Sequence, residues 1–182
     1  MAQPHIKIFS FAPIDEALLM KVSASVTKEF RLPVVIRQGR IDLSDYFDPS
    51  RRQYNGNELL KLIENQFIDD AIKTFGLFNV DLFIPILTYI FGQAFLGGKT
   101  AIASVYRLSN ERYGLKEDKN LLISRTMKEV NHELGHTFGL IHCRIPGCVM
   151  ASSTYVEDID QKTTHLCNRC REEMERGENQ AG

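Results

Sequence analysis

Apolar and polar residues alternate along the chain with two spacings, one typical of strands and the other of helices. Short runs of β-branched and aromatic residues between turn-forming residues predict strands near 5–11, 33–37, 80–84, 88–95 and 100–106. The last two are joined by Gly97-Gly98, whose tight turn would make them an antiparallel pair. Strands that alternate with helices favour parallel pairing elsewhere. The pattern therefore predicts an α/β (α+β) fold with a mixed sheet and one antiparallel edge strand.

Apolar residues at steps of three and four predict the helices. The first helix begins after Pro13, and its buried stripe is Ile14, Leu18, Val22, Val26 and Phe30. A second helix is expected from about Asn57 to Phe75, ended by Gly76. Residues 38–58 are polar and rich in turn formers, which predicts a loop. The charged end of the chain, 171–182, is expected to fray.

The third predicted helix, from about Asn120 to Leu140, carries the most specific motif of the chain. Its apolar stripe consists of Ile123, Met127, Val130, Leu134, Phe138 and Ile141. On the opposite side, His132 and His136 are four residues apart, so both imidazoles can reach one metal ion, with Glu133 beside them. A bare His-Glu-x-x-His string also occurs by chance in unrelated proteins, so the residues that follow decide its meaning.

Those following residues complete the pattern of a catalytic zinc site. Gly139 can adopt the left-handed conformation that ends a helix, and His142 comes three residues later as a candidate third ligand. Three protein ligands and one open position are typical of a catalytic zinc ion, whereas a structural site has four ligands. Met150 suits the methionine turn beneath such a site. The whole string is the metzincin signature.

A second metal site is predicted by the cysteines, which all fall between 143 and 170. Their two pairs have zinc-binding spacing, Cys143-x₄-Cys148 and Cys167-x-x-Cys170. Four thiolates would form a closed, structural site; the alternatives are buried free thiols or two disulfides. Because His142 and Cys143 are neighbours, one peptide unit would join the two metal sites if the chain is extended there.

Size and charge limit the other possibilities. A length of 182 residues, with 43% hydrophobic and 25% charged residues, suits one domain, which we expect to be a monomer. The formal charge of −1 gives no reason to expect nucleic acid as a partner. No apolar segment is long enough to span a membrane, and the N-terminus lacks a signal-peptide pattern. We therefore expect a cytoplasmic protein, with reduced thiols and no membrane partner.

The chain closely resembles the archaemetzincin family of metzincin peptidases. The resemblance lies in the three histidines, the cysteine that directly follows the last of them, the Cys-x-Met string and the downstream Cys-x-x-Cys. The resemblance implies two Zn²⁺ ions, a catalytic one on His132, His136 and His142 and a structural one on Cys143, Cys148, Cys167 and Cys170. It also implies that Glu133 is the general base and that peptide substrates pair along the edge strand near 88–95. Within the single domain, residues 1–139 would form an upper subdomain and 140–182 a small zinc-bound lower lobe.

The resulting hypothesis is hydrolysis of peptide or protein substrates by a water that zinc activates and Glu133 deprotonates. The main alternative is a peptide-binding or scaffold module that keeps zinc but has little proteolytic activity. A nucleic-acid-binding zinc ribbon has little support, because the cysteine segment has no excess of basic residues.

A few further residues are not expected to be catalytic. Ser152 stands where some other metzincins carry a tyrosine, and Tyr155 follows three residues later. His5 is expected to be structural, and His165 to be an exposed loop residue. Arg51 and Arg52 are expected to be solvated loop residues; the alternative is that they bind a carboxylate of the substrate.

Overall fold

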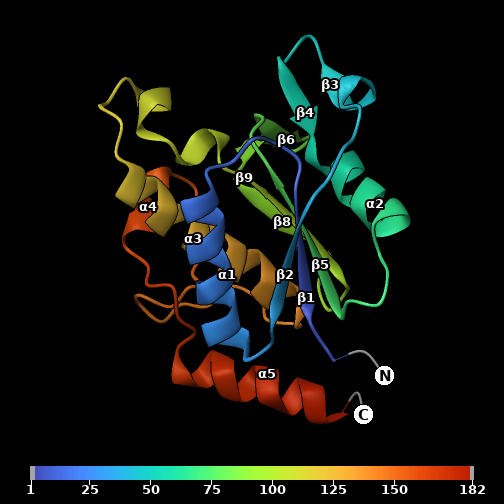
Figure 1. Cartoon of the computed structure of the whole chain (residues 1–182). Coiled ribbons are helices and arrows are strands. Elements are labelled where there is room, and N and C mark those ends of the chain that lie inside the picture. The colour runs from blue at the N-terminus through green and yellow to red at the C-terminus, as the bar shows by residue number, and fades with distance from the viewer. Residues whose placement is uncertain (1–2, 181–182) are drawn as a thin grey trace.

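A mixed sheet forms the centre of the computed structural model, which describes residues 3–180 (Figure 1). Within these residues its strand order is β2-β1-β5-β9-β8, formed by Val34–Gln38, Ile6–Ser10, Lys73–Phe78, Thr100–Ser104 and Gly92–Ala94. The first four strands in this order run parallel to one another, whereas β8 is antiparallel to β9 and lies at the edge. The predicted mixed sheet with one antiparallel edge strand is therefore confirmed.

Helices cover both faces of this sheet, as Figure 1 shows. The helices α1 (Glu16–Phe30) and α3 (Lys119–Thr137) pack together on one face, and α2 (Gly56–Gln66) packs on the other against β5, β8 and β9. The Asp15 side chain caps α1 by accepting hydrogen bonds from the backbone N–H groups of Ala17 and Leu18. Four residues of the predicted α1 stripe are buried, namely Leu18, Val22, Val26 and Phe30.

The helix that carries the histidines, α3, begins within one residue of the predicted start but ends three residues before the predicted Leu140. Val130 and Leu134 are fully buried in the core that α1 and α3 share with the sheet. The helix ends at Thr137, and Gly139 follows with a φ of 89°, in the left-handed region. Ile141 does not belong to the buried stripe: it lies beyond the helix end and is 60% exposed.

The prediction of one long helix from Asn57 to Phe75 was wrong. The helix α2 ends at Gln66, and residues 73–78 form β5, a central strand of the sheet. The turn between them is stabilised by Asp69, which accepts a hydrogen bond from the Ala71 N–H. Gly76, expected to stop the helix, lies inside β5, where a β-carbon would come within 3.2 Å of Ile63 Cγ1.

A second, smaller sheet was not predicted as a separate unit. It has the order β3-β4-β6-β7, formed by Phe47–Asp48, Gln53–Asn55, Leu82–Ile84 and Leu87–Ile90. Two of its strands lie within 38–58, which was expected to be a loop. The expected strand near 88–95 is in fact two strands, β7 and β8, which belong to different sheets and are separated at Phe91.

The remaining elements are short helices and the C-terminal segment. The 3₁₀ helices are Ser44–Tyr46, Tyr106–Leu108 and Asn110–Tyr113, and the last α-helices are α4 (Val156–Asp160) and α5 (Asn168–Gln180). Residues 171–182 were expected to fray, but 171–180 belong to the helix α5, which the buried Met174 anchors to the core. Residues 181–182 lie outside the described residues. The division of the domain at residue 139 stays a prediction.

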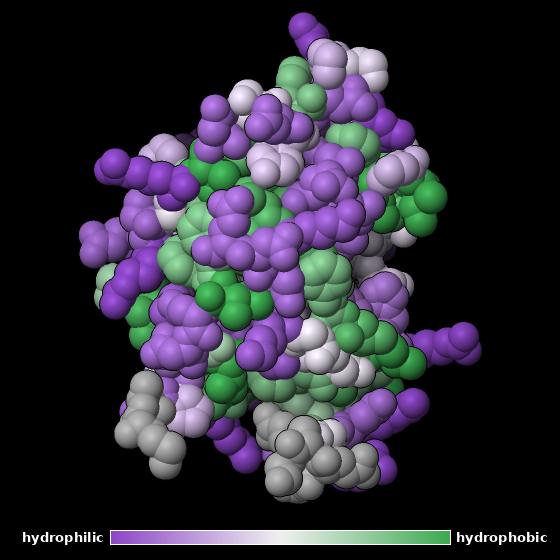
Figure 2. All heavy atoms as spheres, turned by 90° about the vertical axis from the view of Figure 1, so that its right-hand side faces the viewer, coloured by the Kyte–Doolittle hydropathy of each residue, from purple (hydrophilic) through white to green (hydrophobic). Residues whose placement is uncertain are grey.

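The side of the molecule that carries α2 is mostly hydrophilic, with smaller apolar areas between the polar ones (Figure 2). The helix contributes Glu58, Lys61 and Asn65 to the exposed surface, whereas Leu59 and Ile63 are fully buried. This spacing is that of an amphipathic helix on a sheet. Within residues 3–180, no helix combines the length and apolar character that a membrane span requires.

Candidate active site

The three histidines of the metal-site motif converge at the C-terminal end of α3. Their ligand nitrogens lie within 4.8 Å of one another, and the Nε2 atoms of His132 and His136 are 3.1 Å apart. His132 is buried, His136 is half-buried, and His142 is exposed on the segment that follows the helix. The motif spacing placed the first two on one face of α3. The left-handed Gly139 then turns the chain back, so that His142 faces them.

Backbone carbonyls fix the tautomers of the two helix histidines. The Nδ1 atom of His132 is 2.8 Å from the Val149 carbonyl oxygen, and that of His136 is 2.7 Å from the Leu140 carbonyl oxygen. Because a carbonyl only accepts, each Nδ1 must carry the proton, which leaves both Nε2 atoms with free lone pairs. Burial lowers the pKa of all three imidazoles, so they remain neutral.

The geometry of these nitrogens fits a zinc ion. Two acceptor nitrogens as close as the Nε2 atoms of His132 and His136 repel each other unless a cation lies between them. Tetrahedral zinc with Zn–N bonds of about 2.1 Å would hold its ligands about 3.4 Å apart, close to the observed 3.1 Å. Three neutral imidazoles that leave one position open are the ligand set of a catalytic site. We refer to His132, His136 and His142 as the three-histidine site.

A pair of buried carboxyl groups adjoins this site. Glu133 and Glu129 lie one turn apart on α3, and both are buried. Burial, and then the charge of Glu129, raises the pKa of Glu133 well above its ordinary value. The edge strand β8 passes so close that a β-carbon at Gly92 would lie 2.7 Å from Glu133 Cγ. Glu133 is thus held between the histidines and the sheet edge.

Lys162 is a site residue that the sequence did not reveal. Its ammonium group is buried and donates hydrogen bonds to the carbonyl oxygens of Ala151, at 2.7 Å, and Val149, at 3.4 Å. The Val149 oxygen also accepts from His132. Lys162 therefore fixes the 149–151 turn, which His132 joins to α3. No motif pointed to it, because its partners are backbone atoms.

Met150 packs beneath the three-histidine site, as expected for a methionine turn. It is fully buried, and a β-carbon at Gly135 would overlap its sulfur atom. The Met150 carbonyl accepts a hydrogen bond of 2.9 Å from the Cys143 N–H, which closes the loop that begins directly after His142. Gly135 and Met150 thus allow the turn to lie directly against α3.

A cleft of about 670 Å³ runs past the histidines and Glu133. One wall is the segment 84–96, which includes β7 and β8, and the other is formed by 141–142 and 152–155. Ser152 and Tyr155 both line it, and Tyr155 is 63% exposed. The Tyr89 hydroxyl donates a hydrogen bond of 2.8 Å to the Thr154 carbonyl and so connects the two walls.

The four cysteines form a second cluster in the C-terminal segment. Their sulfur atoms lie within 4.8 Å of one another, with Cys143–Cys167 and Cys148–Cys170 each at 3.8 Å. A tetrahedral zinc ion with Zn–S bonds of about 2.3 Å requires sulfur atoms about 3.8 Å apart, so the residues fit this metal. All four are free thiols, which contradicts the disulfide alternative. We refer to these residues as the cysteine cluster.

His165, His5 and Arg51 lie outside both sites. His165 is half exposed but is not only a loop residue, because its Nδ1 atom is 2.8 Å from a carboxylate oxygen of Glu29. His5 lies 3.9 Å from Asp70. Arg51 stacks 4.5 Å over the Phe83 ring and donates a hydrogen bond to the Leu87 carbonyl; it is not among the residues that line the cleft.

Comparison with known proteins agrees with this geometry. The model of Peptidase family M54 matches residues 14–176. The chain is 40% identical to the archaemetzincin of Pyrococcus horikoshii over 142 residues, 76% of either chain. The crystal structure of archaemetzincin from Methanopyrus kandleri superimposes with a TM-score of 0.86 at 29% identity, covering 97% of this chain and 96% of that one. A zinc-dependent peptidase from Methanocorpusculum labreanum gives 0.83 at 30% identity, covering 93% and 99%.

Proposed function

The chain belongs to peptidase family M54, and we propose that this zinc metallopeptidase hydrolyses peptide bonds at the three-histidine site with Glu133 as general base. The observation that carries the proposal is the convergence of three neutral imidazoles beside a buried carboxyl group, at the wall of an open cleft. The imidazoles can hold a metal, the carboxyl group can move a proton, and the cleft can admit a peptide. These are the components of metal-assisted hydrolysis.

The protein residues would divide the chemistry between them. Zinc, when bound by the Nε2 atoms of His132 and His136 and by His142, supplies a Lewis acid that makes water more acidic and polarises the scissile carbonyl. Glu133 would take the proton of the attacking water on a carboxylate oxygen and donate it to the leaving amine nitrogen. Its raised pKa makes it a stronger base than an exposed glutamate once it is ionised.

The edge strand supports the binding of an extended peptide. Along an antiparallel pair of strands, residue pairs that are hydrogen-bonded to each other alternate with pairs that are not. Phe91–Ser104 and Phe95–Thr100 are hydrogen-bonded pairs, because the Ser104 N–H donates to the Phe91 carbonyl and the Phe95 N–H donates to the Thr100 carbonyl. Gly92 and Ala94 therefore direct their N–H and C=O groups away from β9, where a substrate strand can add to the edge.

The walls of the cleft favour apolar substrate side chains. Leu87, Leu96 and Ile141 line it and are 49%, 61% and 60% exposed. The charged lining residues, Glu129, Glu133 and Lys162, are all buried. A charged substrate side chain would lose water there and meet no exposed partner of opposite charge among the described lining residues. We expect cleavage beside apolar residues.

Hydrolysis of a mixed peptide library by the zinc-loaded protein tests the proposal. Wild type should cleave, and Glu133→Gln should bind zinc with similar affinity but lose turnover. Glu157→Gln is the matched control, because Glu157 is exposed and does not line the cleft, so its activity should equal that of wild type. Near-normal activity of Glu133→Gln would exclude Glu133 as the base. Silence of wild type, with zinc present at the histidines, would favour a peptide-binding module.

The same proposal assigns the cysteine cluster to a second, structural Zn²⁺. It also describes the protein as a cytoplasmic monomer that acts on peptides or proteins and binds no nucleic acid. The fit of the sulfur atoms to a tetrahedral zinc site supports the metal, and the free thiols agree with a reducing compartment. The formal charge of −1 argues against phosphate binding. Analytical ultracentrifugation tests the monomer: a sedimenting mass near 20.8 kDa is expected, and twice that mass would contradict it.

A further inference from the structure

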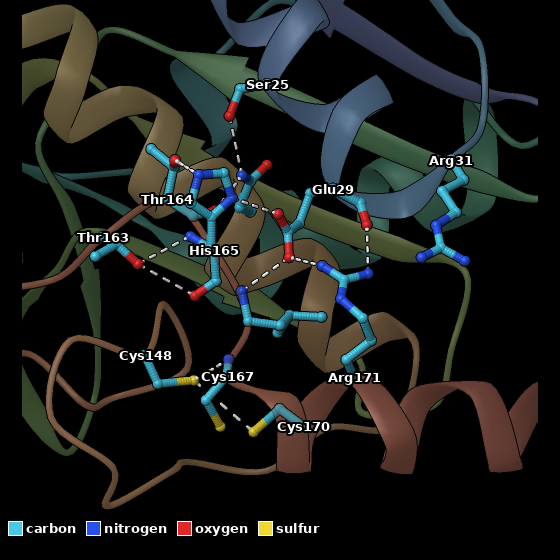
Figure 3. Close-up of polar contacts among 12 residues, drawn as sticks. Ser25, Glu29, Arg31, Cys148, Thr163, Thr164, His165, Cys167, Cys170 and Arg171 are labelled. Carbon is cyan, nitrogen blue, oxygen red and sulfur yellow. Dashed lines mark hydrogen bonds and ion pairs between the residues drawn. The ribbon is translucent and has the colours of Figure 1, made fainter.

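Glu29, in the last turn of α1, is a buried carboxylate outside both metal sites. Its side chain is only 2% exposed, and it points toward the segment that carries His165, Cys167, Cys170 and Arg171 (Figure 3). A buried carboxylate is costly unless hydrogen bonds and opposite charge compensate it. The identity of its partners therefore indicates what the residue does.

All donors to this carboxylate come from one short stretch around the second pair of cysteines. The Leu166 N–H donates a hydrogen bond of 2.8 Å, and the His165 Nδ1 atom lies at 2.8 Å. The Arg171 guanidinium forms an ion pair with the carboxylate and donates a further hydrogen bond of 3.1 Å to the Glu29 carbonyl. The partners on both sides of Cys167 are thus held by a helix of the upper part of the fold.

A second contact holds the same stretch from α3. Asn131, which is fully buried beside His132 in the sequence, donates hydrogen bonds of 2.8 Å to the Thr164 carbonyl and 3.0 Å to Ser25 Oγ. Ser25 and Glu29 lie one turn apart on α1. The 164–171 stretch is therefore attached at two points to the packed pair of α1 and α3.

We propose that Glu29 is a positioning residue for the cysteine cluster, which fixes Cys167 and Cys170 opposite Cys143 and Cys148 before metal binds. The inference rests on the proposal that these thiolates bind zinc. Cys143 and Cys148 lie on the other side of the cluster, on a loop held by the hydrogen bond from the Cys143 N–H to the Met150 carbonyl and by a turn at Gly147. Without Glu29, fewer contacts hold the second pair, so zinc must supply more of its ordering, and that ordering lowers the affinity.

Metal affinity of the cysteine cluster in Glu29→Gln tests the inference. Co²⁺ is the probe, because charge transfer from thiolate sulfur gives an absorption that imidazole ligands do not. Affinity should fall about 10-fold to 100-fold, the loss typical of residues that orient metal ligands. The matched control is Glu175→Gln: Glu175 also joins α5 to α1, through Arg31 at 3.5 Å, but the pair is 47% and 73% exposed. The Glu175→Gln substitution removes the same charge as Glu29→Gln and should leave the Co²⁺ affinity of the cysteine cluster unchanged.

Equal Co²⁺ affinity in Glu29→Gln, Glu175→Gln and wild type would overturn the positioning role. Absence of the thiolate absorption in wild type would overturn the zinc proposal for the cysteines and this inference with it. If Glu29→Gln does not fold, Arg171→Gln keeps the test decisive, because Arg171 is 25% exposed and supplies one of the donors. That variant should also weaken the cysteine cluster, by a smaller factor, and an unchanged affinity would equally count against Glu29.

Discussion

Gly135→Ala should destabilise the protein, although the same change stabilises most helices. Glycine costs roughly 0.5–1 kcal/mol relative to alanine inside a helix. At Gly135, however, the added β-carbon would overlap the sulfur atom of Met150 and come within 3.1 Å of its Cε atom. Met150 is fully buried, so any shift of its side chain must be accommodated inside the core, and the sign of the stability change reports on this contact.

The change in the free energy of unfolding of Gly135→Ala is the sum of two opposing contributions. Overpacking a buried contact costs about 1–3 kcal/mol, and the helix gain offsets up to about 1 kcal/mol of it. Gly177 in α5 is the matched control: it is exposed, and no atom of the described residues lies within 4 Å of a β-carbon there. Gly177→Ala should therefore stabilise by about 0.5–1 kcal/mol. The two variants should differ by about 1–3 kcal/mol, and each kcal/mol corresponds to about 2–4 °C in Tm.

Urea denaturation with zinc at a fixed excess measures both variants. A double-mutant cycle sharpens the comparison, because in a Met150→Ala background the added methyl group meets no sulfur, and Gly135→Ala should then stabilise like the control. If Gly135→Ala stabilises wild type as much as Gly177→Ala does, Met150 does not pack against α3 as described, and the explanation is refuted.

Four further changes test the active site. Gly92→Ala should lower kcat/KM by about 100-fold, because the β-carbon displaces Glu133 and small misplacements of catalytic groups have effects of this size; unchanged kcat/KM would show that the strand yields instead. Acidification should reduce kcat/KM at a pH above the ordinary glutamate value of 4.5, because the raised pKa leaves Glu133 protonated, and a protonated base accepts no proton. Glu129→Gln removes the second cause of that shift and should move the acid limb to lower pH; a limb that stays in place would exclude Glu129. Cys170→Ser should weaken zinc binding at the three-histidine site by about 10-fold in a chelator competition, through the peptide that joins His142 to Cys143; an equal affinity would mean that the two sites are independent.

The arrangement of both metal clusters could be predicted because local sequence spacing determines it. His132 and His136 share a face of α3 for geometric reasons, and Gly139 provides the left-handed residue that turns the chain toward His142. Likewise, the short spacings within each cysteine pair bring the thiols of that pair together. Motifs of this kind depend on a few consecutive residues and little on the rest of the fold.

The central strand β5 could not be predicted, and its burial is the reason. Residues 74–78 are all buried, because α2 covers one face of the strand and the α1–α3 pair covers the other. A strand buried on both faces loses the alternation of apolar and polar residues that identifies an edge or half-exposed strand. Gly76 then suggested the end of a helix, whereas it allows Ile63 and Ile102 to approach β5 closely.

Contacts between distant segments were equally out of reach. Glu29 and His165 are 136 residues apart, and neither belongs to a motif. Lys162 contributes to the 149–151 turn through backbone oxygens, which no residue pattern marks. Such residues can be identified only once the fold has brought their partners together.

The order of ligands along the chain has a consequence for synthesis on the ribosome. A nascent chain that has emerged as far as His142 already carries all three histidines, and its α1, α3 and larger sheet can form. If the cysteine cluster positions His142, the third ligand stays unfixed until Cys167 and Cys170 follow. The peptidase would then acquire its activity only after residue 170 has left the ribosome, well after its last catalytic ligand has been made.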